Sequence, residues 1–159
     1  LIEYAAFFGS IQIFQYLFKN GSKFDSSVWL YGIHSDDSEI IHFLEDNKIN
    51  PPDDSYETCL KESIKCHHND MTRYFQNNFL DGEENKIIDF EEHYKDNIVS
   101  YCFHYHNYSF LPKKIENKYI FFYACQYDYY EIVELILKTK QIDINAKIIS
   151  IRNNFMEFT

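Results

Sequence analysis

The sequence predicts an all-α domain in which about five helix pairs stack on one another. The first observation behind this prediction is a short apolar pattern that occurs five times along the 159 residues. The second is the presence of only 4 Gly and 3 Pro, which argues against a turn-rich β-sandwich. The third is a content of 45% hydrophobic and 19% aromatic residues, enough to fill the space between stacked helices. The length suits a single domain.

The repeated pattern marks the second helix of each pair. Its first apolar residues stand 27, 31, 27 and 34 residues apart, and they are Ile13, Ile40, Met71, Ile98 and Ile132. Residues one, three and four positions further on share the same helical stripe. Nineteen of these twenty positions can pack apolar surface, and Thr72, the exception, keeps a methyl group. A constant stripe at varying intervals indicates helices of fixed length joined by variable loops, as in a solenoid.

The first pair, Leu1–Gly21, shows how each unit is built. Ala5 and Ala6 are small enough for a neighbouring helix to approach closely. Gly9 then breaks the chain before the second helix, which Gly21 ends. Neither helix is long enough to be stable alone in water, so the unit needs the neighbours that the rest of the chain supplies.

The second pair is predicted over Val28–His34 and Ser38–Asp46. A serine at 26 or 27 suits the N-cap of the first of these helices, and an aspartate at 36 or 37 suits the N-cap of the second. Pro51 and Pro52 stop any helix that follows and stiffen the loop.

The later helices follow from the same signals. They are predicted over Tyr56–Cys66, Met71–Asn78, Ile98–Tyr105, Asn117–Tyr127 and Tyr130–Lys138, with the acidic segment Glu83–Asp96 before the fourth second helix. The repeat domain is thus expected over residues 1–145, and residues 146–159 as the start of a further repeat or a frayed end. An uncapped solenoid end exposes apolar surface, so further repeats are expected beyond one or both termini.

Two stretches resemble the ankyrin repeat. Residues 5–21, AAFFGSIQIFQYLFKNG, follow the family pattern AA-x-x-G-x-x-E-I-V-x-L-L-L-x-x-G, and residues 124–137 match it through Glu131-Ile132-Val133 and the L-x-L positions. Asp143-Ile144-Asn145 is similar to the D-x-N turn that opens a repeat. The family's T-P-L-H opening is missing, so its inter-repeat hydrogen bonds are not carried over. The resemblance implies an all-α, ankyrin-type solenoid, similar to divergent domains of unknown function in parasitic protists.

Charge and cysteine usage narrow the classes of partner. The formal net charge of −10 comes without any cluster of Lys and Arg, so nucleic acid and anionic membrane are not expected as partners and a basic protein surface is favoured. No apolar run approaches the ~20 residues that span a bilayer. The four cysteines show no C-x-x-C spacing and fall in predicted helices, which favours a reducing, cytoplasmic setting.

No grouping in the sequence predicts catalysis, a cofactor or a metal. Cys66-His67-His68 are adjacent, and successive helical residues diverge by about 100°, so the two histidines do not face one ion. Cys102, His104 and His106 would share a side only in a strand. The carboxylates of the acidic segment are expected to form a solvated face; they are Glu83, Glu84, Asp89, Glu91 and Glu92.

The resemblance implies a non-catalytic scaffold that binds another protein through its first helices and the tips of its connecting loops. The candidate partner-binding residues at these tips are Lys23, Phe24, Asp25, Asp53, Asp54, Asp81, Glu83 and Glu84. Phe24 is expected either to anchor a partner or to fold onto its own repeat. Two alternatives remain: a structural spacer within a longer repeat protein, and a hydrolytic or metal-binding site on the acidic or histidine-containing repeats.

Overall fold

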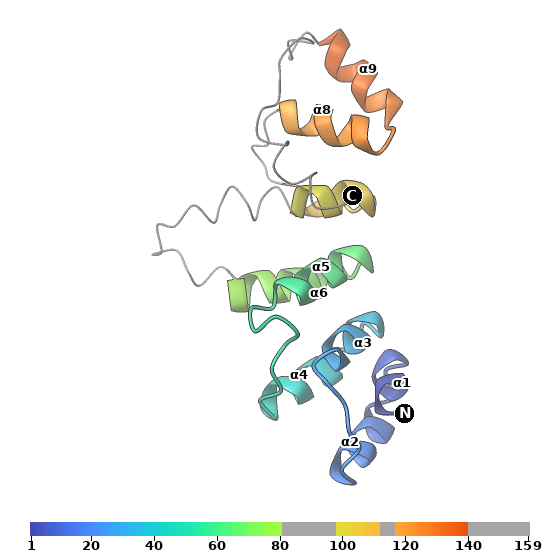
Figure 1. Cartoon of the computed structure of the whole chain (residues 1–159), viewed down its shortest axis with the longest axis vertical. Helices are drawn as coiled ribbons and strands as arrows, with labels where there is room; N and C mark the ends of the chain where they lie inside the picture. The colour runs from blue at the N-terminus through green and yellow to red at the C-terminus, as the bar shows by residue number, and fades with distance from the viewer. Residues whose placement is uncertain (81–97, 112–116, 140–159) are drawn as a thin grey trace, which may run out of the picture. The chain divides into compact units, whose positions relative to one another are not determined.

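A computed structural model describes residues 1–80, 98–111 and 117–139 (Figure 1). All regular structure in these ranges is helical, which confirms the predicted all-α class. The chain divides into two compact units, Leu1–Phe110 and Leu111–Thr159. The predicted extent of the repeat domain, residues 1–145, stays a prediction. The acidic segment lies outside the described residues.

The helices of the first unit occur as consecutive pairs. The pairs are α1 (Ile2–Phe7) with α2 (Ile11–Lys19), α3 (Val28–His34) with α4 (Ser38–Asp46), and α5 (Glu57–Lys65) with α6 (Asn69–Phe75). A π-helix over Gln76–Leu80 continues α6, and a helix over residues 98–104 and a 3-10 turn over Tyr108–Phe110 follow. In the second unit α8 (Asn117–Gln126) pairs with α9 (Tyr130–Lys138).

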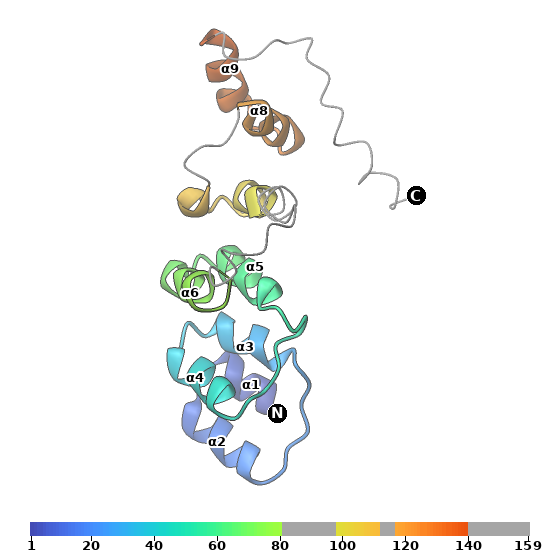
Figure 2. The same cartoon turned by 90° about the vertical axis from the view of Figure 1, so that its left-hand side faces the viewer.

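The first helices stack in chain order, because α1 packs on α3 and α3 packs on α5. In Figure 2 the second helices α2, α4 and α6 lie along one side of this unit. Small residues let the helices approach at one repeated position, which holds Ala5, Gly32 and Ser63, all buried. A Cβ on Gly32 would lie 3.0 Å from Cγ2 of Ile40, so the second pair leaves no ordinary room for a side chain there.

The backbone conformation of the turns between helices also repeats from pair to pair. The residue that ends the turn within a pair has a positive φ in four pairs, and these residues are Gly9, Asp36, His67 and Asp128. In three of these turns the next residue donates its backbone N–H across the turn, from Ser10 to Ala5, from His68 to Ser63 and from Tyr129 to Ala124. A second turn, after the second helix, has positive φ at Gly21, Lys48 and His106. These are helix-ending turns that use the left-handed region, where only glycine is free of strain.

Lys48 and Gly21 occupy the same place in successive repeats, so they form a matched pair for a stability test. Lys48 is exposed with a φ of 56°, and a Cβ on Gly21 would have no neighbour within 4 Å. Since the left-handed region costs an L-residue about 1 kcal/mol, Lys48→Gly should raise the free energy of unfolding by about 0.5–1 kcal/mol and Gly21→Ala should lower it by a similar amount. Urea denaturation measures both. A loss of stability in Lys48→Gly would contradict the left-handed backbone conformation at residue 48.

The apolar stripe of the second helices is narrower than predicted in α2 and α9, whereas its first residue is buried in α4 and α6, at Ile40 and Met71. In α2, Phe14 is fully buried, whereas Ile13 is 58% and Tyr16 66% exposed. In α9, Ile136 is buried and Leu135 is exposed. The second and fourth residues of the stripe are buried or half-buried in all five helices. In α2 the prediction was wrong for Ile13 and Tyr16, because the buried side of α2 is centred on Phe14 and includes the half-buried Phe18, which moves Ile13 and Tyr16 to its edge.

Thr72, the polar exception in the stripe, is completely buried and fully paired. Its hydroxyl lies 2.9 Å from the Ser63 hydroxyl oxygen, to which it donates, and 3.0 Å from the carbonyl oxygen of His68. Ser63 in turn donates to the carbonyl of Leu60 at 2.8 Å. The third pair thus accommodates two hydroxyls in its core because each satisfies a neighbour.

Candidate functional site

The loop between α2 and α3 contains the first predicted tip. Lys23 and Asp25 are exposed. Asp25 accepts a hydrogen bond from the Ser27 N–H at 2.8 Å, and hydrogen bonds from Ser27 hold the pKa of this carboxyl below its ordinary value. Phe24 is half-buried and its ring packs on Phe18, with the centroids 5.8 Å apart. The loop is therefore held at two points, by Asp25 and Phe24, and the side chains of Lys23 and Asp25 remain exposed to solvent.

The loop between α4 and α5 contains the second tip and is ordered by Asp53. One Oδ of Asp53 accepts hydrogen bonds from the N–H and the hydroxyl of Thr58, both at 2.7 Å, and the other accepts from the Ser55 N–H at 3.2 Å. Asp54 is exposed and has a φ of 54°. The predicted site residues Asp81, Glu83 and Glu84 lie outside the described residues.

Removal of the Asp53 carboxylate should destabilise the fold in a pH-dependent way. Burial raises the pKa of Asp53, but the hydrogen bonds from Thr58 and Ser55 lower that pKa by more, so it falls below its ordinary value. A carboxyl whose pKa is lower in the folded state contributes stability above its unfolded pKa of about 3.9, and this contribution is lost as the pH falls through the folded pKa. Asp53→Ala should therefore lower the free energy of unfolding by about 1 kcal/mol at pH 7, with a smaller loss in strong acid. Urea denaturation at both pH values measures this difference, and an equal loss at both would contradict it.

Aromatic side chains stand on the outward side of the first helices. Tyr4, at 68% exposed, and Tyr31, at 39% exposed, occupy the same position in α1 and α3. Phe7 and Phe8 are also exposed, and their rings meet edge to face at 5.2 Å. Sequence reasoning included the first helices in the binding surface but named residues only at the loop tips, so it missed these side chains, although the alternation of buried and outward positions in α1 could have revealed them.

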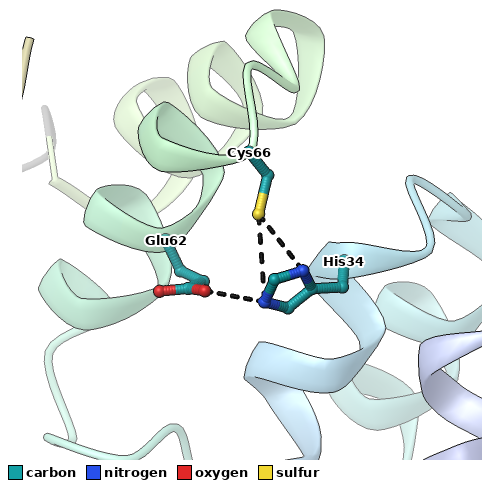
Figure 3. Close-up of side chains that lie close together, drawn as sticks. All are labelled: His34, Glu62 and Cys66. Carbon is teal, nitrogen blue, oxygen red and sulfur yellow. Dashed lines mark hydrogen bonds and ion pairs between the residues drawn. The ribbon is translucent and has the colours of Figure 1, made fainter. Parts of the chain in front are cut away.

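The structure brings together three side chains that lie far apart in the sequence. His34 is the last residue of α3, and Glu62 and Cys66 lie four residues apart on one side of α5. His34 Nε2 lies 2.8 Å from Glu62 Oε1, and Cys66 Sγ lies 3.5 Å from His34 Nδ1 and 4.0 Å from Nε2 (Figure 3). We call these residues the His34–Glu62–Cys66 cluster. Each can offer one ligand atom, and the ligand atoms lie within 4.8 Å of one another.

Two further groups border this cluster. The Lys65 ammonium lies 2.9 Å from Glu62 Oε1. Burial, followed by the nearby Glu62 carboxylate, raises the pKa of the Cys66 thiol. Asp36, whose Oδ1 lies 3.3 Å from His68 Nδ1, is also near enough to raise the pKa of the Cys66 thiol. The thiol is therefore protonated at neutral pH unless a cation binds to it.

The metal groupings considered from the sequence do not assemble in the described residues. His67 turns away from Cys66 and lies 2.8 Å from the carbonyl oxygen of Tyr105. Cys102 is buried while His104 and His106 are exposed. Cys59 is buried, as expected of a cysteine in a helix, but Cys125 is exposed and does not serve as a core residue.

The described residues form helix pairs, and within the first unit these pairs stack on one another. A family model described as the ankyrin repeat matches residues 116–146, which confirms the resemblance drawn from the sequence. Over this stretch the chain is similar to the ankyrin repeat, and ankyrin repeats generally act in protein–protein interaction without catalysis. No curated protein and no solved structure matches the chain. Among the described helices, none is long and apolar enough to cross a membrane.

Proposed function

We propose that this chain is a non-catalytic scaffold that holds a protein partner against the outward side of its first helices and the adjoining loop tips. The observation that carries the proposal is the exposure of Tyr31. This residue lies in α3, which has α1 on one side and α5 on the other, yet its side chain stays open to solvent. Tyrosine provides large, rigid contact area with a polar end, which makes it frequent in the centre of interfaces.

The rigidity of the surface supports the same proposal. The tip loops are tied down by Asp25 and Asp53 through hydrogen bonds to the start of the following helix. A surface that is ordered before binding loses little conformational freedom when a partner binds. The net charge of −10 favours a partner with a basic surface and accelerates its encounter at low salt.

Quantitative pull-down from source-cell lysate tests this function. The bait is the full chain, beside Tyr4→Ser/Tyr31→Ser and a matched control, Ile13→Ser/Tyr16→Ser. The control removes exposed apolar residues of similar size from α2, a second helix. A partner retained by the wild type and the control but lost by the first variant is the expected result. Equal retention by all three baits would contradict a binding surface on the first helices.

A further inference from the structure

The His34–Glu62–Cys66 cluster is not a requirement of the fold. In the alignment of the repeats, residues 34, 62 and 66 correspond to Phe7, Tyr4 and Phe8 of the first pair, all exposed. These outward positions contribute nothing to the buried core of that pair. The His34 ring packs on Phe7, with 5.3 Å between the ring centroids, but this contact does not account for three side chains with metal-binding atoms at one junction between pairs.

We propose that His34, Glu62 and Cys66 form a binding site for a divalent transition metal ion of the zinc type, which ties α3 to α5. Imidazole nitrogen, carboxylate oxygen and thiolate sulfur are the three ligand types that zinc uses in proteins. Three protein ligands leave the fourth tetrahedral position for water or for a side chain of a partner.

The distances from His34 Nε2 are near those that such an ion requires. Ligand bond lengths of about 2.0–2.3 Å at tetrahedral angles place a nitrogen about 3.4 Å from an oxygen and about 3.6 Å from a sulfur. His34 Nε2 lies 2.8 Å from Glu62 Oε1 and 4.0 Å from Cys66 Sγ. Cys66 Sγ is also 3.5 Å from Nδ1, whereas an ion on Nε2 would hold the sulfur about 5 Å from that atom. Binding thus requires the imidazole to turn until Nε2 faces the thiol, a movement of about 1–2 Å, which side-chain rotation supplies because His34 is 33% exposed.

The electrostatic surroundings favour a cation at this place. His34 ends α3 and Cys66 caps the C-terminus of α5, so the negative ends of two helix dipoles meet there. The Glu62 carboxylate adds a full negative charge, which only the Lys65 ammonium contacts among the lysines and arginines of the described residues. Lys65 is exposed, so an ion can displace its ammonium into water at little cost.

The same three residue types also occur in thiol hydrolases, where a histidine activates a cysteine. The surroundings of Cys66 oppose that role. A nucleophilic cysteine needs a lowered pKa, which a helix N-terminus or a neighbouring cation provides. Cys66 instead lies at a helix C-terminus beside a carboxylate. A bound metal ion removes this conflict, because the ion itself stabilises the thiolate.

Titration with Co²⁺ as a spectroscopic substitute for zinc tests the site. The full chain, reduced with a phosphine and kept free of oxygen, is titrated with cobalt chloride. We expect a thiolate-to-cobalt charge-transfer band and tetrahedral d–d bands that saturate at one equivalent and disappear on addition of Zn²⁺. Loss of an outer-shell partner already weakens metal binding about 10–100-fold, so Glu62→Gln and His34→Asn should weaken cobalt binding by about 100-fold or more.

The cysteine variants decide which thiol is used. Cys66→Ser should lose the charge-transfer band, and Cys125→Ser, which removes an exposed thiol outside the cluster, should retain it. Circular dichroism checks that each variant keeps its helices; if Cys66→Ser unfolds, Glu62→Gln, which keeps the thiol, decides instead. The proposal is overturned if the wild type shows no saturable band, if the band persists in folded Cys66→Ser, or if Glu62→Gln binds cobalt as tightly as the wild type.

Discussion

Replacement of Trp29 by alanine is expected to lower the free energy of unfolding of the chain by about 3–5 kcal/mol. Trp29 is fully buried in α3, and its ring packs edge to face on Tyr56, with 5.3 Å between centroids, and near Phe75 at 6.4 Å. Its indole N–H donates to the carbonyl of Ile49 at 3.1 Å, which fixes the loop before α5. The alanine variant loses this packing, leaves a cavity and deprives the carbonyl of its partner.

Urea denaturation of Trp29→Ala and Trp29→Phe measures the effect. The phenylalanine variant retains most of the ring contact and loses the indole hydrogen bond, so its loss should be about 1–2 kcal/mol. The exposed aromatic Tyr16 is the control, and Tyr16→Ala should change stability by less than about 0.5 kcal/mol. A cost below 1 kcal/mol for Trp29→Ala would show that the second and third pairs are not joined through this ring.

Replacement of Asn107 by alanine is expected to cost about 2 kcal/mol, since two hydrogen bonds at a buried site are lost. Asn107 is buried, and its Nδ2 donates to the carbonyl of Ile64 at 2.9 Å and to Asn69 Oδ1 at 3.0 Å. These bonds join the turn after residues 98–104 to α5 and α6. The Ile64 carbonyl, near the end of α5, also accepts the His67 N–H at 3.2 Å, so Asn107 is its second donor.

Asn47→Ala is the matched control for this prediction. Asn47 also donates its side-chain amide to a helix carbonyl, that of Phe43 at 2.8 Å, but it is exposed, so water replaces it. Thermal and urea denaturation should show a loss for Asn107→Ala that exceeds the loss for Asn47→Ala by at least about 1 kcal/mol. Equal losses would mean that the hydrogen bonds of Asn107 contribute no more to stability than the exposed hydrogen bond of Asn47 does.

The pairing of short helices could be predicted from the sequence because the residues that begin and end a helix stand on either side of a run with helical apolar periodicity. Val28–His34, Ser38–Asp46 and Tyr130–Lys138 have the bounds that the sequence predicts. Asp37 caps α4 through a 2.9 Å hydrogen bond from the Glu39 N–H, as expected for a helix N-terminus. The predicted serine cap of α3 makes no such bond; the loop before α3 is instead held by the Ser27 N–H, which donates to Asp25.

The His34–Glu62–Cys66 cluster could not be predicted in the same way, because it depends on the register of α3 against α5. His34 and Cys66 are 32 residues apart, and nothing local links them. Alignment of the repeats does place residues 34, 62 and 66 on the outward side of neighbouring first helices, so this alignment is the signal that could have found them. Sequence reasoning looked for metal ligands among neighbours in the chain and therefore grouped Cys66 with His67 and His68.

Site-specific photo-crosslinking at Tyr31 tests the proposed binding surface most directly. A photoreactive phenylalanine derivative is introduced in place of Tyr31, or in place of the exposed Tyr16 on α2 as a control, and the chain is irradiated in source-cell lysate. A discrete crosslinked protein at position 31 that is absent at position 16 is the predicted result. No adduct at 31, or the same adducts at both positions, would contradict binding through the first helices and would favour a spacer role.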